Sequence, residues 1–291
     1  MSNPAILEML KSYTCKSDQD HINALREIMQ SIALSALARN DFFYHAAFYG
    51  GTALRILYGL DRGSEDLDFS LLKPDEHFDL MKYANGIETE FSAFGMTALF
   101  SEKIKMVNTN IQSGFLKSNT QTQLLSIGID EKLAKQINAR REVKIKIEVD
   151  VFPPSGFDTE MKYLYQPYPF AVRSYCLPDL LADKLHAVLF RKWKKRVKGR
   201  DWYDLAWYAG KYPQYNLSHL ENRARQSGDY TDPSPLNSDS VRQMLSERLA
   251  EVDIKAMKTD VRPFLRDVRS LNVWSKDFFA DVFQRLSGKQ A

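Results

Sequence analysis

The spacing of hydrophobic residues predicts helices and strands in turn along the first half of the chain. Apolar residues recur every three or four positions over 17–39, where Ser17 and Asp20 can start a helix. Strict alternation of apolar and polar residues predicts a strand over 143–152. The same patterns predict a strand end at 47–49, one or two helical turns at 52–58, a strand at 65–72, helical structure at 74–94 and strands or a hairpin at 97–116.

The second half of the chain has mostly helical patterns. The Pro-Pro-Ser-Gly sequence at 153–156 breaks the preceding strand, and we place a domain boundary near 155–175. We expect an α+β fold, with a mixed α/β domain over 1–165 that contains an N-terminal helix, and a mostly helical C-terminal domain over 166–291. Its predicted elements are helices from Pro178 to about Trp193, from about Asp201, over 240–251 and over 276–287, and a loop at 229–240.

The composition is that of a folded protein, with 44% hydrophobic and 26% charged residues among 291. No apolar run reaches the roughly 18–20 residues that a membrane helix needs, and the N-terminal segment with Glu8 lacks the pattern of a secretory signal. Cys15 and Cys176 form no metal or redox motif, so we expect a cytoplasmic protein, without membrane association, that depends on a hydrophobic core. The histidines show no metal-ligand spacing, and His186 is expected to be structural.

Two aspartates lie two positions apart in the strand predicted at 65–72. Because side chains alternate along a strand, Asp66 and Asp68 share one face, while Leu67 and Phe69 share the other. Two carboxylates 4 Å apart repel by about 1 kcal/mol in water and by about 4 kcal/mol at an effective dielectric constant of 20. A cation such as Mg²⁺ relieves this repulsion. The simpler interpretation, an exposed edge with two solvated aspartates, suits most isolated Asp-x-Asp pairs.

A glycine pair precedes these aspartates. Gly50, Gly51 and Thr52 stand between a predicted strand end and predicted helical turns, where backbone amide groups favour a phosphate. A phosphate-binding turn, a helix and then a strand with Asp-x-Asp is the layout of a nucleotidyltransferase. A third carboxylate is expected on the alternating strand, where Glu148 and Asp150 share the polar face; the alternative is a solvent-facing strand whose lysines balance these acids.

A lysine falls beside or within the apolar stripe of the first predicted helix of the second half. Lys184 lies four residues from Leu180 and Val188. It can be buried with a partner, reach the surface, which is the simplest interpretation, or contact a nucleotide phosphate. Asp201 and Asp204 follow, three apart at the start of the next helix. Asp201 suits an N-cap, whereas Asp204 is better placed to orient Lys184 or a ligand.

Positive charge is concentrated between these two helices. The net charge of the chain is +3, but residues 191–200 hold seven basic residues and no acidic one, so the remaining 33 basic and 37 acidic residues give −4. Such runs are often only solvated, but this one contains a tryptophan and adjoins a candidate active site, which suits an RNA backbone. A second basic stretch spans 132–146. The residues expected to bind RNA are Lys192, Lys194, Lys195, Arg196, Lys198 and Arg200.

Together, in this order, these motifs resemble the AbiEii/AbiGii toxin nucleotidyltransferases, a MenT-like family of type IV toxin–antitoxin systems. The resemblance implies a DNA polymerase β-like nucleotidyltransferase fold in the first domain, and a helical second domain that contributes its lysine and aspartate motifs to the active site. It also implies an abortive-infection or phage-defence toxin that uses NTP and Mg²⁺, or Mn²⁺ in its place. The matching segments are Phe48–Leu54, Arg62–Phe69, Lys144–Val149, Leu181–Ala187 with Arg191, and Arg200–Leu205.

The resemblance also implies roles for individual residues. The implied catalytic residues are Asp66, Asp68, Lys184, Asp201 and Asp204. The implied nucleotide-binding residues are Gly50, Gly51, Thr52, Ser64, Lys184 and Arg191. The metal ligands are Asp66 and Asp68, with Glu148 or Asp150 as the third. Ser64 is two positions before Asp66, so phosphorylation there would place negative charge against the triphosphate site and inhibit the enzyme.

We therefore expect transfer of a nucleoside monophosphate from NTP to RNA, foremost to the tRNA 3′ acceptor end, which blocks translation, and neutralisation by a cognate antitoxin. One alternative is transfer to a small molecule such as an antibiotic, although that acceptor needs no basic segment. Another is a non-catalytic RNA- or partner-binding module on this fold, against which the intact Asp66, Asp68 and Lys184 weigh.

Overall fold

The computed structural model describes residues 3–103, 110–126, 129, 131–136, 140–191 and 197–289, which fold into two compact units. The first unit comprises 1–53, 65–153 and 161–174, and the second comprises 54–64, 154–160 and 175–291. Two short segments of the domain predicted over 1–165, namely 54–64 and 154–160, therefore belong to the second unit. The first unit combines a sheet with helices and the second is mostly helical, so the predicted α+β class is confirmed.

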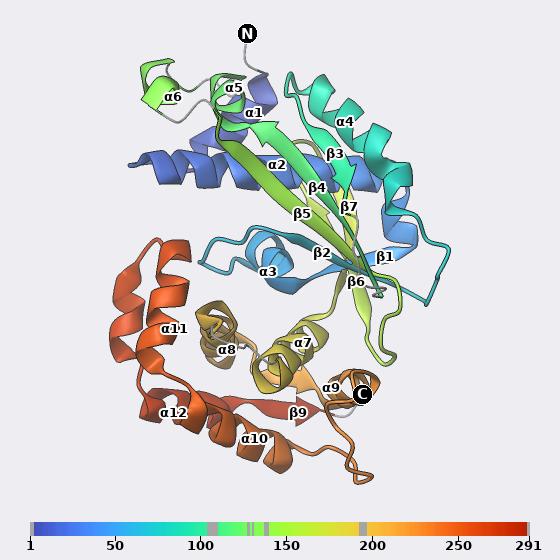
Figure 1. Cartoon of the computed structure of the whole chain (residues 1–291), viewed down its shortest axis with the longest axis vertical. Helices are drawn as coiled ribbons and strands as arrows, with labels where there is room; N and C mark the ends of the chain where they lie inside the picture. Colours follow the sequence, from blue (N-terminus) through green and yellow to red (C-terminus); the bar gives the residue numbers. More distant parts are fainter. Residues whose placement is uncertain are drawn as a thin grey trace. The chain divides into compact units, whose positions relative to one another are not determined.

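A seven-stranded mixed sheet forms the centre of the first unit (Figure 1). Its strands are β1 (Ala46–Tyr49), β2 (Leu67–Leu71), β3 (Leu99–Glu102), β4 (Ile111–Asn119), β5 (Glu142–Asp150), β6 (Thr159–Leu164) and β7 (Phe170–Tyr175). They are arranged in the order β3-β4-β5-β2-β1-β7-β6. β2 is antiparallel to β1 and parallel to β5, β1 is parallel to β7, and β4 is antiparallel to both β3 and β5.

The first predicted helix is confirmed as α2 (Asp18–Arg39), which contacts α1 (Pro4–Lys11) and β5. It begins with a capping box, in which the Ser17 hydroxyl accepts a hydrogen bond from the Asp20 N–H and the Asp20 carboxylate accepts one from the Ser17 N–H. The other helices before residue 140 are α3 (Gly50–Tyr58), α4 (Ala84–Ala93), α5 (Thr120–Ser126), α6 (Glu131–Gln136) and the 3₁₀ helices Phe42–Tyr44 and Leu80–Tyr83.

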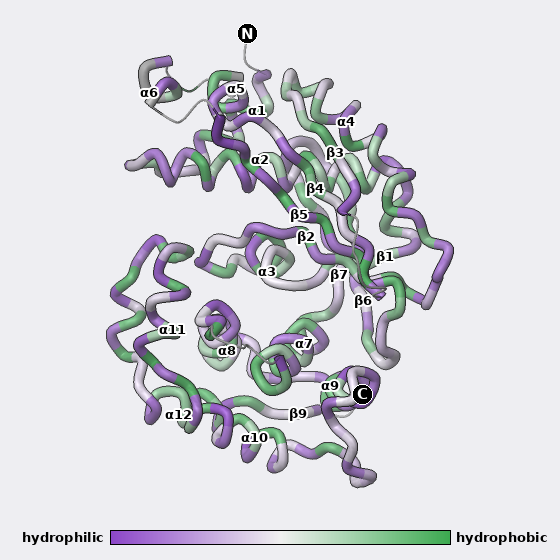
Figure 2. The backbone as a smooth tube through the Cα atoms, viewed as in Figure 1, coloured by the Kyte–Doolittle hydropathy of each residue, from purple (hydrophilic) through white to green (hydrophobic). Residues whose placement is uncertain are grey.

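The core of the first unit fixes which way the strands face. Leu67 and Phe69 of β2 are buried, as are the alternate apolar residues of β5, and the Phe69 ring lies 4.8 Å from that of Phe42 and 5.2 Å from that of Phe48, centroid to centroid. Figure 2 shows hydrophilic and hydrophobic residues alternating along β5. A slip of one residue would bury the polar set instead, so the polar residues of β2 and β5 are held on the opposite face.

The second unit consists mainly of helices, as predicted. In α7 (Leu177–Phe190), Pro178 occupies the first turn, where its missing N–H costs nothing. α7 contacts α8 (Gly199–Lys211) and α9 (Leu217–Gln226). The remaining elements are α10 (Ser238–Glu251), α11 (Ile254–Val261), α12 (Lys276–Arg285), the 3₁₀ helices Arg262–Phe264 and Val268–Val273, and a parallel pair of strands, β8 (Gln214–Asn216) and β9 (Ser287–Lys289). None of the helices in the described ranges has the length and apolarity required to cross a bilayer.

Two stretches differ from the sequence predictions. Residues 74–79 are not helical. The Asp75 carboxylate accepts a hydrogen bond from the His77 N–H, which favours a turn, and the Asp79 carboxylate caps the 3₁₀ helix that begins only at Leu80. The stretch 155–175, predicted only as a boundary, contains β6 and β7. Phe48 of β1 is the register partner of Ser174 in β7, a pairing of residues distant in sequence that local spacing does not reveal.

Candidate active site

Asp68 lies on β2 between two neighbouring strands, and Asp66 directly precedes β2. Asp68 is the register partner of Tyr49 in β1 and of Glu148 in β5. Because register partners on adjacent strands point to the same face, Asp68 and Glu148 lie side by side on the polar face of the sheet. The predicted arrangement of an aspartate strand beside an acidic strand is therefore present, while metal binding by these residues stays a prediction.

Strand register distinguishes the two candidates for the third carboxylate. Glu148 is opposite Asp68, whereas Asp150 is opposite Ser70. One Asp150 oxygen also accepts a hydrogen bond of 3.1 Å from the backbone N–H of Phe152, which gives this side chain a role at the end of β5. The register therefore favours Glu148 as the partner of Asp68.

The donor set suits a hard divalent cation. Asp66, Asp68 and Glu148 offer only oxygen ligands, which Mg²⁺ prefers. The Lys146 Nζ lies 2.7 Å from one Glu148 oxygen, and the Ser113 hydroxyl donates a hydrogen bond of 3.0 Å to the other, so this carboxylate is held on the polar face. Over the described residues, no group of three or more His, Cys, Asp or Glu side chains is drawn together as in a formed metal site. The donor set thus suits such a cation by chemistry, and the register places two of its members, Asp68 and Glu148, side by side.

The turn between β1 and α3 approaches Asp68 closely. Gly50 has a φ of 82°, a left-handed conformation that suits glycine. A Cβ atom on Gly50 would lie 2.5 Å from the Asp68 Oδ2, closer than a side chain tolerates. Thr52 is buried, and its hydroxyl donates a hydrogen bond to the Asp66 carbonyl. The turn predicted to bind phosphate is therefore fastened to the aspartate strand through Thr52 and packed against Asp68 through Gly50.

The second unit contains a cluster of four buried charges. The ammonium group of Lys184 on α7 lies 3.0 Å from Asp201 and 2.9 Å from Asp204, both on α8. Arg62 donates two hydrogen bonds of 2.6 Å, one to each carboxylate oxygen of Asp204. The two cations and two carboxylates balance in charge, which offsets the cost of removing them from water.

Burial and pairing set the protonation of this cluster. Burial disfavours the charged form of Asp201, but the positive charges of Lys184, Arg191 and Lys198 outweigh it and lower the pKa of Asp201 to about 2. Burial also opposes the charge of Lys184, and the two aspartates outweigh it and raise the pKa of Lys184. The simplest sequence interpretation, that Lys184 reaches the surface, is wrong, because only 13% of its side chain is exposed. N-capping by Asp201 is also wrong, because Lys198 occupies the N-cap of α8.

Arg62 is a member of this cluster for which the sequence alone predicts no role. It is 2% exposed and lies in the segment 54–64. Its neighbours fasten the same segment, since the Tyr203 hydroxyl donates to Asp61 at 2.6 Å and the Gly63 N–H donates to a backbone carbonyl beyond α11 at 2.8 Å. The only signal in the sequence is an isolated arginine four residues before Asp66, and nothing local indicates its partner.

Only some of the other residues with predicted binding roles lie within the described ranges. The Arg200 guanidinium lies 4.1 Å from the ring centroid of Phe264, and burial lowers the pKa of Lys198. Arg191 follows the end of α7, where its backbone carbonyl accepts a hydrogen bond from α10. Ser64 is half-buried. Their binding roles stay predictions. The predicted RNA-binding residues outside the described ranges are Lys192, Lys194, Lys195 and Arg196.

His186 has the contacts of a structural residue. Its Nε2 lies 3.1 Å from the Ser227 hydroxyl and 3.6 Å from the Asp229 carboxylate. Burial, with the nearby charge of Arg223, lowers the pKa of His186 to about 4, so the ring is neutral near pH 7.

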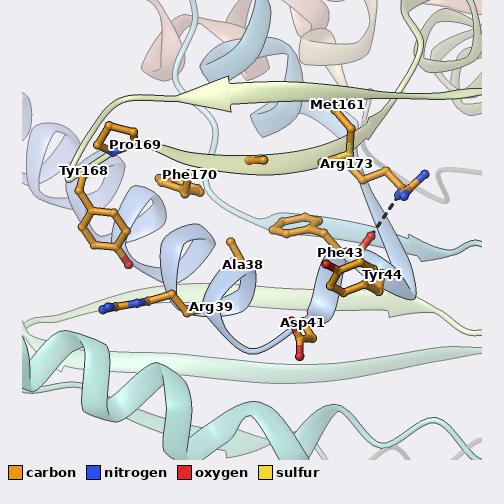
Figure 3. Close-up of a pocket in the computed structure, with 11 residues that line it drawn as sticks. Ala38, Arg39, Asp41, Phe43, Tyr44, Met161, Tyr168, Pro169, Phe170 and Arg173 are labelled. Carbon is orange, nitrogen blue, oxygen red and sulfur yellow. Dashed lines mark hydrogen bonds between the residues drawn. The ribbon is translucent and has the colours of Figure 1, made fainter.

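A pocket of about 440 Å³ lies elsewhere in the first unit (Figure 3). Met161, Phe170 and Arg173 of β6 and β7 line it together with Arg39 and Phe43, which come from α2 and the following 3₁₀ helix. The Arg173 Nε donates a hydrogen bond of 3.1 Å to the Phe43 carbonyl, drawn in Figure 3. The pocket is lined by none of the described residues for which catalysis, metal binding or nucleotide binding is predicted, so it is separate from the carboxylate face.

The sequence matches the model of one protein family, and the structure is similar to solved structures. The family model described as "Nucleotidyl transferase AbiEii toxin, Type IV TA system" matches residues 32–282. The solved structure of MenT4, a nucleotidyltransferase toxin from Mycobacterium tuberculosis H37Rv, is similar with a TM-score of 0.56 and 16% identity, over 98% of this chain and 88% of that one. JHP933 from Helicobacter pylori is similar with a TM-score of 0.51 and 18% identity, over 89% of each chain. No curated protein matches the sequence.

Proposed function

Because the chain belongs to the AbiEii family of nucleotidyl transferase toxins of type IV toxin–antitoxin systems, we propose that it transfers a nucleoside monophosphate from NTP to the 3′ acceptor end of tRNA and so blocks translation. The observation that carries this proposal is the polar face of the sheet, where Asp68 and Glu148 are register partners. Gly50 brings the turn that precedes α3 against the same Asp68 carboxylate. Carboxylates beside a glycine turn are the parts that nucleotidyl transfer requires.

Each part of the polar face has a proposed task. Asp66, Asp68 and Glu148 would hold a divalent cation, Mg²⁺ by donor type. When bound, such a cation lowers the pKa of an attacking hydroxyl and stabilises the charge on the departing pyrophosphate. The backbone N–H groups of Gly51 and Thr52 at the start of α3 favour the negative charge of the triphosphate.

The charge cluster of the second unit has a proposed task of its own. Lys184 keeps its positive charge because its pKa is raised, and a compact ammonium group is suited to a phosphate. Asp201 and Asp204 fix the position of this ammonium group through contacts of 3.0 and 2.9 Å. Arg62 in turn holds Asp204 through two hydrogen bonds. We assign phosphate binding to Lys184 and orientation of Lys184 to the other three.

Labelled nucleotides test this function directly. The full-length protein is incubated with each radiolabelled NTP and Mg²⁺, with and without a total tRNA pool, and the RNA 3′ ends are then sequenced. We expect label at tRNA 3′ ends with the wild type and none with Asp66→Ala or Asp68→Asn. Glu76→Gln, which removes an exposed carboxylate of the same unit, is the control and should transfer normally. Full activity of Asp66→Ala, or label only on a small molecule in the tRNA-free arm, contradicts the proposal.

The family also implies an antitoxin partner, and we propose that a cognate antitoxin neutralises this chain. Growth arrest on expression of the chain, relieved when the antitoxin is expressed with it, is the expected result. Arrest that persists with Asp68→Asn would show toxicity without nucleotidyl transfer and would contradict the proposed mechanism.

A further inference from the structure

The polar face of the sheet continues from the carboxylates onto β4, where it becomes basic. Phe115 of β4 is the register partner of Lys146 in β5, and Lys117 is that of Lys144. Directly opposed residues of antiparallel strands share a face. Lys146 and Lys144 alternate with the buried residues of β5 in the same phase as Glu148, the partner of Asp68. Phe115, Lys117 and Lys144 therefore lie on the face that carries the carboxylates.

Three lysines surround the Phe115 ring. The ammonium nitrogen of Lys144 lies 3.8 Å from the ring centroid, that of Lys103 5.6 Å and that of Lys117 5.9 Å. Lys103 directly follows β3, and its N–H donates a hydrogen bond of 2.8 Å to the Ser113 carbonyl, which places it beside β4. The electron-rich face of an aromatic ring attracts cations, so Phe115 keeps together three positive charges that come from the residue after β3, from β4 and from β5.

These lysines are not engaged in ion pairs among the described residues, although Glu142 lies two residues from Lys144 on the same face of β5. None of the ion pairs within the described parts of the chain involves Lys103, Lys117 or Lys144, whereas Lys146 is paired with Glu148 at 2.7 Å. Lys103 and Lys144 are exposed, and Phe115 and Lys117 are half-buried. Like charges held this close repel one another, and a polyanion that binds them relieves the repulsion.

We propose that Lys103, Phe115, Lys117 and Lys144, here called the lysine platform, bind the phosphodiester backbone of the single-stranded 3′ end of the RNA acceptor. The proposal rests on the proposed function. Position favours RNA over an acidic protein, because the Phe115–Lys146 pair lies only two residues, about 7 Å along the strand, from the Ser113–Glu148 pair. An acceptor strand held there is adjacent to the carboxylates at which its terminal hydroxyl would react.

Equilibrium binding tests the platform without any chemistry. A short fluorescent single-stranded RNA is titrated with the full chain at several salt concentrations, without NTP. Each phosphate contact to single-stranded RNA contributes about 0.7 to the slope of log affinity against log salt. We expect Lys103→Gln, Lys117→Gln and Lys144→Gln each to lower the slope by about 0.7, and the triple variant to lower it by about 2 and to bind at least about tenfold more weakly.

A matched control exists within the same unit. Lys82 is also an exposed lysine over aromatic rings, 5.4 Å from the centroid of Phe78 and 4.9 Å from that of Tyr83, but it lies outside the strands of the polar face. Lys82→Gln should leave both affinity and slope unchanged. Phe115→Leu keeps an apolar side chain but removes the ring, so the lysines disperse and the affinity should fall between those of the wild type and the triple variant. Circular dichroism checks that every variant is folded.

The outcomes separate this proposal from the proposed function. If the triple variant binds RNA as the wild type does, or if polyglutamate competes as strongly as RNA of equal charge, the platform is overturned even where transfer to RNA is observed. If the wild type binds RNA with the expected slope but transfers nothing to it, the proposed reaction fails and the platform stands. In a transfer assay, the triple variant should show a raised KM for RNA and an unchanged KM for NTP.

Discussion

The guanidinium group of Arg62 grips the carboxylate of Asp204 with two parallel hydrogen bonds of 2.6 Å, in a site where both side chains are almost completely buried. Asp204 also contacts Lys184 at 2.9 Å, so one carboxylate holds two cations. An arginine that makes two parallel hydrogen bonds fixes the orientation of the carboxylate and also neutralises its charge. The segment 54–64 is thereby held to the helices that carry the other members of the cluster.

Removing Arg62 should destabilise the second unit strongly. Arg62→Ala leaves Asp204 buried beside fewer positive charges, and breaking a buried ion pair from one side costs about 3–5 kcal/mol. Arg62→Lys should recover only part of this, because lysine keeps the charge without the two-pronged contact. Urea unfolding followed by tryptophan fluorescence measures the effect, since the tryptophans of the described ranges, Trp202, Trp207 and Trp274, belong to the second unit.

The control for Arg62 is an exposed ion pair of the same unit. Arg285 contacts Asp281 at 2.9 Å one helical turn away, with both side chains largely in solvent. Arg285→Ala should change the unfolding midpoint very little. An equal loss of stability in the Arg285 and Arg62 variants would show that the buried geometry of Arg62 is not what stabilises the unit.

Two glycines with the same backbone conformation should differ in their effect on activity. Gly50 and Gly59 have φ values of 82° and 72°, so alanine at either position costs about 1–2 kcal/mol in strain. A Cβ on Gly59 meets nothing within 4 Å, whereas one on Gly50 meets the Asp68 carboxylate at 2.5 Å. Gly50→Ala should reduce kcat about 100-fold by displacing Asp68, and Gly59→Ala should not. Steady-state kinetics at saturating NTP decides between them, and equal rates would exclude Gly50 from the site.

The two acids of β5 should not be equivalent. Glu148→Gln removes a candidate ligand opposite Asp68, and we expect it to lower kcat about 100-fold or more and to raise the Mg²⁺ concentration needed for half-maximal rate. In Asp150→Asn, the amide oxygen still accepts the hydrogen bond from the Phe152 N–H, so the effect should be small. Magnesium titrations of both variants are the measurement. The reverse order of effects would transfer the third-ligand role to Asp150.

His186 should make the second unit less stable as pH falls. Its pKa is lowered from 6.5 to about 4, mainly by burial, so between these values the unfolded chain binds more protons than the folded one. This contribution to stability is complete above pH 6.5 and declines as pH falls towards 4, by about 3 kcal/mol in all. His186→Gln does not titrate, so its urea midpoint, followed by tryptophan fluorescence, should decline less over this range. Parallel pH profiles of the variant and the wild type would contradict this.

The sequence predicted those helices and strands that are marked by neighbouring residues, such as capping residues or alternating apolar positions. The capping residues Ser17 and Asp20 marked the start of α2, and strict alternation marked β5. The strands β6 and β7 were missed because β7 is completed by β1, far away in sequence. The stretch 74–79 is not helical because Asp75 bonds to the backbone two residues onward and favours a turn, while Asp79 caps a helix that begins at Leu80.

In the candidate site too, features set by local spacing were predicted, whereas contacts between distant segments were not. Asp66 and Asp68 were identified because alternation puts them on one face, and strand register then favoured Glu148 over Asp150. Asp204 is predicted as a residue that could orient Lys184, and the structure places it 2.9 Å from the ammonium group; the second partner, Asp201 at 3.0 Å, is predicted from its spacing only as an N-cap. Contacts between distant segments, such as that of Arg62 with α8, produce no regular spacing of residues, so they could not be predicted from the sequence.

The order of charges along β5 gives the polar face a direction. Glu142 begins the strand, Lys144 and Lys146 follow it, and Glu148 and Asp150 end it, with Lys144 to Asp150 spanning about 20 Å. A polyanion laid along this strand is attracted at Lys144 and repelled at those carboxylates that hold no cation. A chain that continues past the carboxylates meets this repulsion, while a chain that stops there avoids it. If the chain acts on RNA as we propose, this order of charges would favour the terminus over the interior of the nucleic acid, without any contact to a base.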